Sequence, residues 1–177
     1  MNKNYFAILA PLVFLNFIST ILASSLQVKI YKLEENNTKK NIGIIEIGEN
    51  TYGLIFTPSL FSLSKGLHGF HVHENPSCDT NDGVIGGAAG RHYDPDHTNK
   101  HLGPYNINGH LGDLPALYVD KQGRATMSVI APRLKKLSEI EGRSLIIHEG
   151  GDNQSDSPLP HGGGGARLAC GIIKKQF

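Results

Sequence analysis

Residues 67–73, Leu-His-Gly-Phe-His-Val-His, carry the strongest structural signal in the chain. Apolar and polar side chains alternate from Phe70 to His73, which is the pattern of a β-strand with one face in a core. His71 and His73 then share the other face, and two imidazoles at this spacing can reach one metal ion. The pair alone is equally typical of an exposed strand without a metal. The segment therefore predicts a strand that separates a core from a candidate site.

Further strands are expected on both sides of this segment. Alternating or β-branched runs lie at residues 26–30, 42–47, 52–57, 116–119, 124–130, 144–148 and 167–173. Pro58 is expected to end the third run. A turn at residues 120–123 joins two others in a hairpin with Ala125, Met127 and Val129 on one face. Only residues 133–141, with apolar side chains at helical spacing, predict a short helix, so the chain is expected to be an all-β sandwich or barrel.

Two long loops interrupt this pattern of strands. Residues 75–113 and 149–165 are too rich in Gly, Pro, Asn and Asp to form core strands. Loops of this length inside a compact domain are usually functional. They are the expected place for a binding or catalytic site.

The N-terminal residues have the features of a secretory signal peptide. Lys3 precedes an apolar run at residues 6–22, which ends in the small residues Ala23, Ser24 and Ser25. The run is also long enough for an uncleaved membrane anchor, which is the alternative. We expect a signal peptide at residues 1–23, one domain at residues 24–177, and export without stable membrane association after cleavage. In an oxidising compartment the even number of cysteines, Cys78 and Cys170, favours a disulfide.

The charge balance excludes two classes of protein. The 177 residues include 17 basic and 16 acidic side chains, a net charge of +1. This balance argues against a nucleic-acid-binding protein and against an acidic, disordered tail. Lys3 is the only charged side chain in residues 1–23, so the mature chain, without these residues, has a net charge of zero. Attraction of a charged ligand would then depend on local charges.

Histidine is the residue type in surplus, with nine in the chain. Besides the pair already described, the candidate metal ligands are His92, His101, His110, Asp113 and His148. A set of imidazoles with one carboxylate and no thiolate suits zinc, whereas an imidazole-only set suits copper. The pattern therefore predicts two metal ions bound in or beside the first long loop.

Four motifs in this order resemble those of the copper/zinc superoxide dismutases, in particular the bacterial secreted type. They are Gly69-Phe70-His71-Val72-His73-Glu74-Asn75, Gly109-His110-Leu111-Gly112-Asp113-Leu114-Pro115, His148-Glu149-Gly150-Gly151-Asp152-Asn153, and the glycines at 162–165 followed by Ala166-Arg167-Leu168-Ala169-Cys170-Gly171. The resemblance covers residues 26–173. It implies an eight-stranded antiparallel Greek-key barrel with two long functional loops, in a protein exported to the periplasm.

The resemblance also implies the activity and the role of each site residue. The reaction is dismutation of superoxide to dioxygen and hydrogen peroxide, with copper and zinc as cofactors. Copper would be held by His71, His73, His92 and His148, and zinc by His92, His101, His110 and Asp113. His92 would bridge the two metals as an imidazolate, Asp152 would link a copper histidine to a zinc histidine, and Arg167 would guide the anionic substrate. A Cys78–Cys170 bond would close a loop of about 90 residues.

The remaining histidines and two departures from the family pattern have separate interpretations. His68 is expected to be a hydrogen-bonded structural residue, and His161 is expected to face solvent. His97 is not expected to bind zinc, because the family pattern assigns that role to His101. Arg91 stands where a small residue is expected and adds positive charge, and Glu149 adds negative charge beside a copper ligand. Both affect attraction of the substrate without removing a ligand.

Two functions other than dismutation are compatible with parts of the sequence. One is a binding module, either a secreted copper and zinc carrier or a dismutase-like domain that has lost catalysis. A degenerate member of the family would be expected to lack a copper ligand or the guiding arginine, and this chain has all of them. A two-zinc hydrolase would need an Asp-His continuation after His71-Val72-His73, where the chain has Glu74-Asn75. The sequence leaves open whether the protein is a monomer or a homodimer.

Overall fold

The computed structural model describes residues 25–35 and 38–174, so the expected signal peptide lies outside the described residues. The strands are β1 (Ser25–Leu33), β2 (Lys39–Asn50), β3 (Gly53–Leu60), β4 (Gly66–His68), β5 (Phe70–His73), β6 (Leu117–Val119), β7 (Val129–Ala131), β8 (Arg143–His148) and β9 (Arg167–Ile173). Only Gly69 separates β4 from β5, so these two form one interrupted strand and the expected eight strands are present. Three short 3-10 turns complete the structure: η1 (Gly87–Ala89), η2 (Leu137–Glu139) and η3 (Pro160–Gly163).

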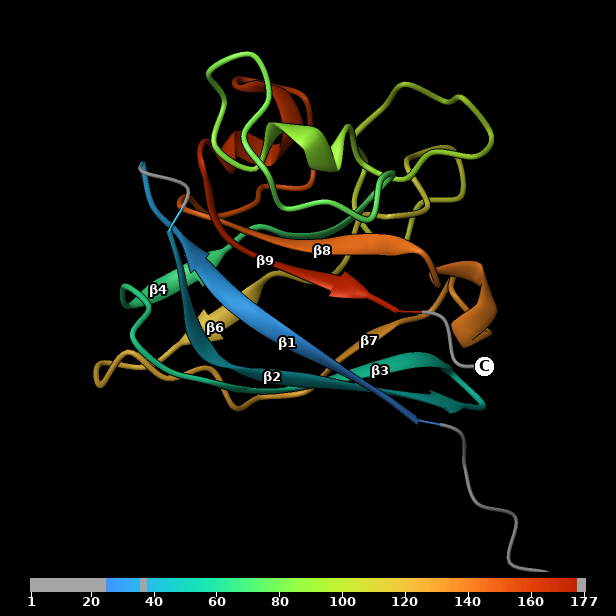
Figure 1. Cartoon of the computed structure of the whole chain (residues 1–177). Helices are drawn as coiled ribbons and strands as arrows, with labels where there is room; N and C mark the ends of the chain where they lie inside the picture. Colours follow the sequence, from blue (N-terminus) through green and yellow to red (C-terminus); the bar gives the residue numbers. More distant parts are fainter. Residues whose placement is uncertain (1–24, 36–37, 175–177) are drawn as a thin grey trace, which may run out of the picture.

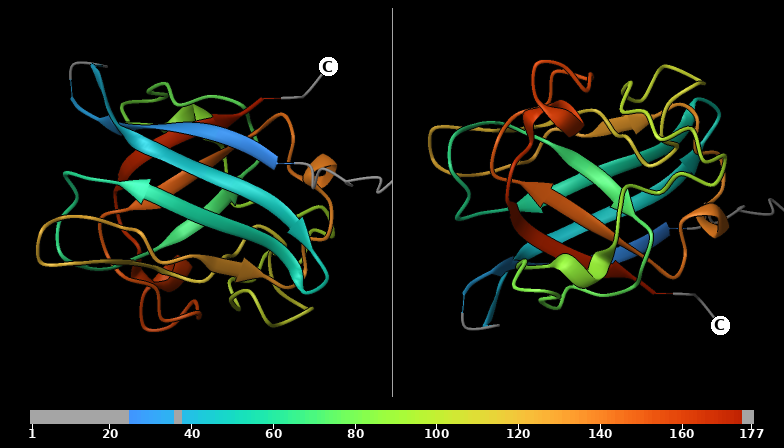
Figure 2. Two further views of the ribbon diagram at one scale, coloured as in Figure 1. Left: turned by 90° about the horizontal axis from the view of Figure 1, so that it is seen from below. Right: turned by 90° about the horizontal axis from the view of Figure 1, so that it is seen from above.

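The strands form a curled antiparallel sheet. Seven of them follow the order β5-β8-β9-β1-β2-β3-β7, and β4 pairs with β6. Since β4 continues into β5 and a turn joins β6 to β7, the sheet curves back on itself, as Figures 1 and 2 show. The chain steps from β3 to β4 across the barrel, and β9 returns to pair with β1, as in a Greek key. The all-β prediction is therefore confirmed.

The inside of the barrel is filled by apolar side chains from all sides. Phe56 of β3 and Phe70 of β5 meet edge to face, with ring centroids 5.6 Å apart. Val72 also faces this core, as the alternation in β5 predicts. His71 and His73, on the other face of β5, are buried as well, because the long loops cover that face. The packed barrel thus forms the wall that lies under the loops.

Strand β3 does not end at Pro58, contrary to the expectation from the sequence. It runs to Leu60, and Pro58 is paired with Ile45 of β2. The Leu60 backbone N–H donates to the Ala125 carbonyl, on the side of β3 away from β2. Backbone groups two residues apart point the same way, so the nitrogen of Pro58 also faces that side. The β3–β7 ladder stops at Phe56, so the missing N–H of Pro58 removes no ladder bond there.

The expected helix at residues 133–141 and the expected strand at residues 124–130 are also wrong in extent. Leu134, Leu137 and Ile140 are buried, but only the 3-10 turn η2 forms among them, and three-residue spacing fits such a turn as well as an α-helix. The second segment forms a strand only from Val129, with Ala125 in an isolated bridge to Leu60.

Within residues 25–35 and 38–174, no helix is long and apolar enough to span a membrane.

The two cysteines form a disulfide on the outside of the barrel. Cys78, in the loop after β5, is bonded to Cys170 of β9, with their Cα atoms 5.7 Å apart. The bond lies in a small buried cluster with Leu33, Ala89 and Ile146. The loop is thereby fixed against the outer faces of β8 and β9, beside the buried histidines.

Candidate metal centre

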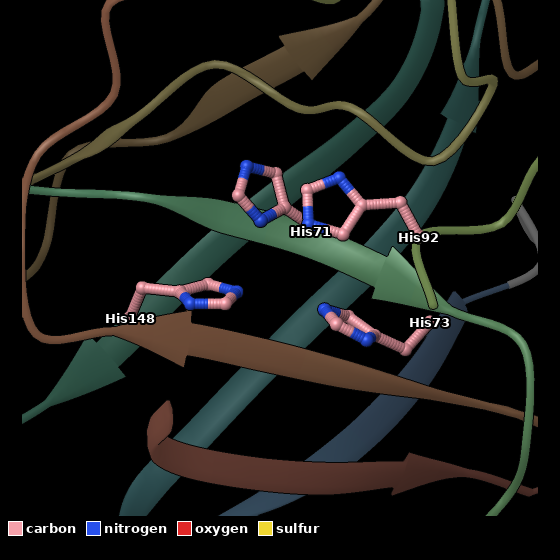
Figure 3. A group of neighbouring side chains, drawn as sticks. All are labelled: His71, His73, His92 and His148. Atoms are coloured by element: carbon pink, nitrogen blue, oxygen red, sulfur yellow. The ribbon is translucent and has the colours of Figure 1, made fainter. Parts of the chain in front are cut away.

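Four histidines meet above the outer face of β5 and β8. His71 and His73 come from β5, His148 from the end of β8, and His92 from the first long loop, as Figure 3 shows. The loop passes beside β5 like a further strand. The backbones of His92 and His73 form an isolated antiparallel β-bridge, and the Tyr93 N–H donates to the Val72 carbonyl at 2.8 Å. The backbone therefore carries His92 to the pair on β5.

The ring nitrogens of these histidines fit one metal ion. One ligand atom from each of the four lies within 4.8 Å of all the others, and all four side chains are buried. His71 Nδ1, His73 Nε2 and His148 Nε2 are buried without any hydrogen-bond partner. Buried polar atoms normally have partners, so three unpartnered nitrogens in one cluster indicate a site that can bind a metal cation.

The opposite nitrogen of each ring is held by the protein. His71 Nε2 donates to Asp152 Oδ2 at 2.8 Å, and His73 Nδ1 donates to the Gly90 carbonyl at 3.0 Å. His148 Nδ1 donates to the Gly165 carbonyl at 3.1 Å. Such contacts fix the tautomer and the orientation of metal-binding imidazoles. The orphaned nitrogen of each ring is thus the one left free to bind.

A second cluster surrounds the carboxylate of Asp113. Its Oδ1 atom lies 3.0 Å from His92 Nδ1, 3.0 Å from His101 Nδ1 and 3.3 Å from His110 Nδ1. Tetrahedral zinc ligands with bonds of about 2.0 Å lie about 3.3 Å from one another, so these spacings fit a zinc ion. The group around Asp113 whose ligand atoms all lie within 4.8 Å of one another contains His71, His92 and His101, and it leaves out His110. His92 belongs to both clusters in either grouping.

Asp152 connects the two clusters. Its Oδ2 accepts from His71 Nε2, and its Oδ1 accepts from His101 Nε2 at 2.9 Å. Gly162 packs against this carboxylate with φ +71°, and a Cβ atom there would lie 2.1 Å from Asp152 Oδ1. Only glycine fits, because both the space and the positive φ exclude a side chain. The glycine run therefore allows the second loop to close over Asp152.

Burial and hydrogen bonds give the titratable groups opposite pKa shifts. Burial lowers the pKa of His71 and His73 well below the usual value, and it lowers the pKa of His148 to about 4. Burial also acts on His101, but the Asp113 and Asp152 carboxylates overcome it and raise the His101 pKa to about 9. Burial raises the pKa of Asp113, yet its histidine contacts hold that pKa well below the usual range. The first cluster thus offers neutral imidazoles, and the second a carboxylate.

Arg167 lies beside the four-histidine cluster. It lines a cavity of about 630 Å³ together with His73, His92 and His148. Its two Nη atoms donate to the carbonyls of Gly86 and Gly90, at 2.5 and 2.6 Å. Gly90 also accepts from His73, so one carbonyl holds both the guanidinium and a candidate ligand. This contact follows from backbone geometry, and no residue-type signal in the sequence could have revealed it.

The other histidines are placed nearly as expected. His68 is buried and structural, with Nδ1 donating to the His148 carbonyl at 2.7 Å and Nε2 within 2.8 Å of the Ser64 carbonyl. His97 is exposed and lines the cavity, apart from the Asp113 cluster. His161 is exposed as expected, but its ring centroid lies 5.1 Å from that of His92, a proximity that the sequence did not reveal.

Comparison with known proteins finds relatives that are similar in sequence and in fold. A sequence profile of the copper/zinc superoxide dismutase family matches residues 41–173. The chain is 56% identical over 153 residues to a protein of Actinobacillus pleuropneumoniae named Superoxide dismutase (Cu-Zn), covering 84% of this chain and 80% of that protein. The fold matches the Cu/Zn superoxide dismutase from Brucella abortus with a TM-score of 0.82 and 50% identity, covering 85% of this chain and 100% of the other.

A further solved structure is that of the monomeric copper, zinc superoxide dismutase from Salmonella enterica. It matches with a TM-score of 0.75 and 50% identity, over 85% of this chain and 100% of the other. The profile match at residues 41–173 includes both long loops and every residue of the two clusters.

Proposed function

The chain belongs to the copper/zinc superoxide dismutase family, and from this membership we propose that it converts two superoxide ions and two protons into dioxygen and hydrogen peroxide. It is an oxidoreductase whose cofactors are copper and zinc. When bound, copper supplies one-electron redox chemistry, and zinc, which has none, supplies fixed positive charge. The remaining tasks fall to the side chains of the protein.

The structural observation that supports this proposal is a set of buried imidazole nitrogens without hydrogen-bond partners. His71 Nδ1, His73 Nε2 and His148 Nε2 are buried without partners, while the opposite nitrogen of each ring is held by the protein. An imidazole-only set suits copper. We assign copper to these three histidines and His92.

Zinc is assigned to His92, His101, His110 and Asp113. The alternative grouping replaces His110 with His71. His71 Nε2 donates to Asp152, and its orphaned Nδ1 belongs to the first cluster. His110 Nδ1, in contrast, lies 3.3 Å from Asp113 Oδ1. These contacts favour His110 as the fourth zinc ligand.

His92 is assigned the role of the shared ligand. Its Nδ1 lies against Asp113, which leaves Nε2 for the copper cluster. An imidazole without either N–H proton is stable only between two cations. His92 Nε2 can then take up a proton during the reaction and release it to the product.

Arg167 is assigned the role of the substrate guide. It presents a permanent positive charge in the cavity next to the copper cluster. Fixed charge in a cleft raises the local concentration of an oppositely charged substrate, an effect for which superoxide dismutases are themselves a known example. Since the mature chain is neutral by composition, this local charge supplies the attraction.

Residues 1–23 are proposed to be a signal peptide that directs export to the periplasm. The charged start, the apolar run and the small residues at its end support this assignment. The Cys78–Cys170 disulfide supports an oxidising compartment. N-terminal sequencing of the exported protein tests the cleavage site, and a retained Lys3 would reject it.

The activity is tested by superoxide consumption of the purified mature protein, with copper and zinc measured in the same sample. Rapid consumption by protein that carries one copper and one zinc is expected. Inactivity with both metals fully bound would reject the proposal and favour a metal carrier.

The shared ligand is tested separately in protein with cobalt in place of zinc. Magnetic coupling between cobalt and copper is expected in the wild type and should be absent in His92→Ala. The matched control is His68→Gln, because His68 contacts the His148 backbone but belongs to neither cluster. Uncoupled metals in the wild type would reject the bridge.

A further inference from the structure

Arg91 lies in the same cavity as the copper cluster and Arg167. It directly precedes His92 in the chain and lines the cavity with His73, His92 and His148. Its backbone is fixed against the end of β5: the Arg91 N–H donates to Glu74 Oε2 at 3.0 Å, and the Arg91 carbonyl accepts from the Glu74 N–H at 3.0 Å. The long side chain therefore starts from a defined point on the cavity wall.

The guanidinium of Arg91 is exposed to solvent and to dissolved anions, whereas the guanidinium of Arg167 is held by backbone carbonyls. Arg167 is partly buried, and both of its Nη atoms donate to backbone carbonyls. Arg91 is exposed, and in the described part of the chain its side chain has no ion pair or hydrogen bond. Its charge is thus free to act on a solute that enters the cavity.

Two carboxylates also line the cavity, and they differ in how far they oppose Arg91. The Asp94 carboxylate accepts from the Thr98 hydroxyl at 3.0 Å and from the Asn99 N–H at 2.8 Å, so it is directed into its own loop. Glu74 is exposed and accepts from the Arg91 backbone. Glu74 is therefore the negative charge placed closest in the chain to the copper ligand His73.

Four other basic residues do not line the cavity. Arg133 donates to the carbonyls of Gly109 and His110, and Lys136 pairs with Glu49 at 3.2 Å. Neither these two nor Lys100 and Lys135 line the cavity. Glu149, beside the copper ligand His148, is exposed and outside the lining as well. Among the described residues, Arg91 and Arg167 are the two cavity-lining side chains with permanent positive charge.

We propose that Arg91 is a second anion-attracting residue of this cavity, which draws small anions towards the copper cluster, and that Glu74 moderates its effect. Arg167 is held close to the ligands and positions the anion, whereas Arg91 acts over a longer distance through solvent. This role rests on the proposed function for the identity of the substrate. Its effect on anions in general follows from the charge alone and can be measured without turnover.

The experiment measures azide binding to the copper(II), zinc-loaded protein by absorption titration, and superoxide consumption as a function of ionic strength. Arg91→Gln is expected to weaken azide binding about threefold at low salt, as for one partly screened charge. Its superoxide rate should also depend less steeply on ionic strength. Glu74→Gln should strengthen azide binding, because it removes a negative charge from the cavity. The amide oxygen can still accept from the Arg91 backbone, so the position of Arg91 should not change.

Two further variants separate charge at the cavity from other effects. Lys121→Gln removes the same charge from an exposed turn outside the cavity and should match the wild type. Arg91→Lys keeps the charge and should restore azide affinity. Equal azide affinities and equal salt dependence in Arg91→Gln and Lys121→Gln would overturn the inference, as would failure of Arg91→Lys to restore binding. A fully loaded wild type that consumed no superoxide would reject the proposed function, and the azide titration would still decide the role of Arg91.

Discussion

The Cys78–Cys170 disulfide is expected to be a large contributor to stability. The bond joins residues 92 positions apart and fixes the loop between β5 and residue 91 on the outside of β8 and β9. Replacing both cysteines with alanine removes this constraint from the unfolded chain, which then gains conformational freedom. The cluster of Leu33, Ala89 and Ile146 around the bond still packs in the folded state.

The magnitude follows from the length of the closed loop. For a separation of 92 residues, the chain-entropy relation gives a loss of about 4.6 kcal/mol at 25 °C as an upper figure, and about 2–4 kcal/mol is typical of measured disulfides. In a domain of this size, 1 kcal/mol changes the midpoint of thermal unfolding by about 2–4 °C. The midpoint should therefore fall by roughly 5–15 °C.

Urea unfolding of metal-free protein measures this difference without a contribution from bound metal. The Cys78→Ala/Cys170→Ala variant is compared with oxidised wild type, and reduced wild type serves as the control that keeps both sulfur atoms. Reduced wild type and the variant should have similar free energies of unfolding. A loss below about 1 kcal/mol in both would refute the reasoning, because packing alone would then order the loop.

Three further predictions concern the metal centre and its cavity. Asp152→Asn leaves one acceptor oxygen for two histidines, so zinc affinity should fall about 10–100-fold in a chelator competition, and an unchanged affinity would contradict the link. Gly162→Ala should displace Asp152 and weaken zinc binding similarly, whereas Gly165→Ala, at a comparable φ but with nothing within 4 Å, should keep zinc affinity. Equal zinc affinities in these two variants would contradict the steric argument. Arg167→Gln should reduce superoxide consumption about tenfold at low salt with unchanged metal content, and an undiminished rate would reject the guide role.

Most of the fold could be predicted because the alternation of side chains reflects burial directly. Phe70 and Val72 face the core and His71 and His73 face away, as the period of two requires. The predicted ends of strands and of the helix differ from the structure where contacts with neighbouring segments decide the local conformation. Pro58 does not interrupt β3 because no β7 residue is paired with it. The position at which β7 ends therefore decides whether the proline is tolerated.

The candidate ligands could be predicted from residue types, and the structure brings these side chains together. What the sequence could not reveal is how they are held. The carbonyls of Gly86 and Gly90 have no identity in a sequence, yet they orient Arg167 and His73. The approach of His161 to His92 depends on the path of the second loop. Backbone acceptors and loop contacts are properties of the folded chain alone.

Strand β5 divides its residues between two independent tasks. One face contributes Phe70 and Val72 to the barrel interior, and the other carries His71 and His73 outside it. Mutations can therefore accumulate on the outer face without changing the residues that drive folding. In evolutionary terms, a descendant of this chain could lose its chemistry and keep its architecture, so retention of the barrel in a relative is weak evidence that the relative retains catalysis.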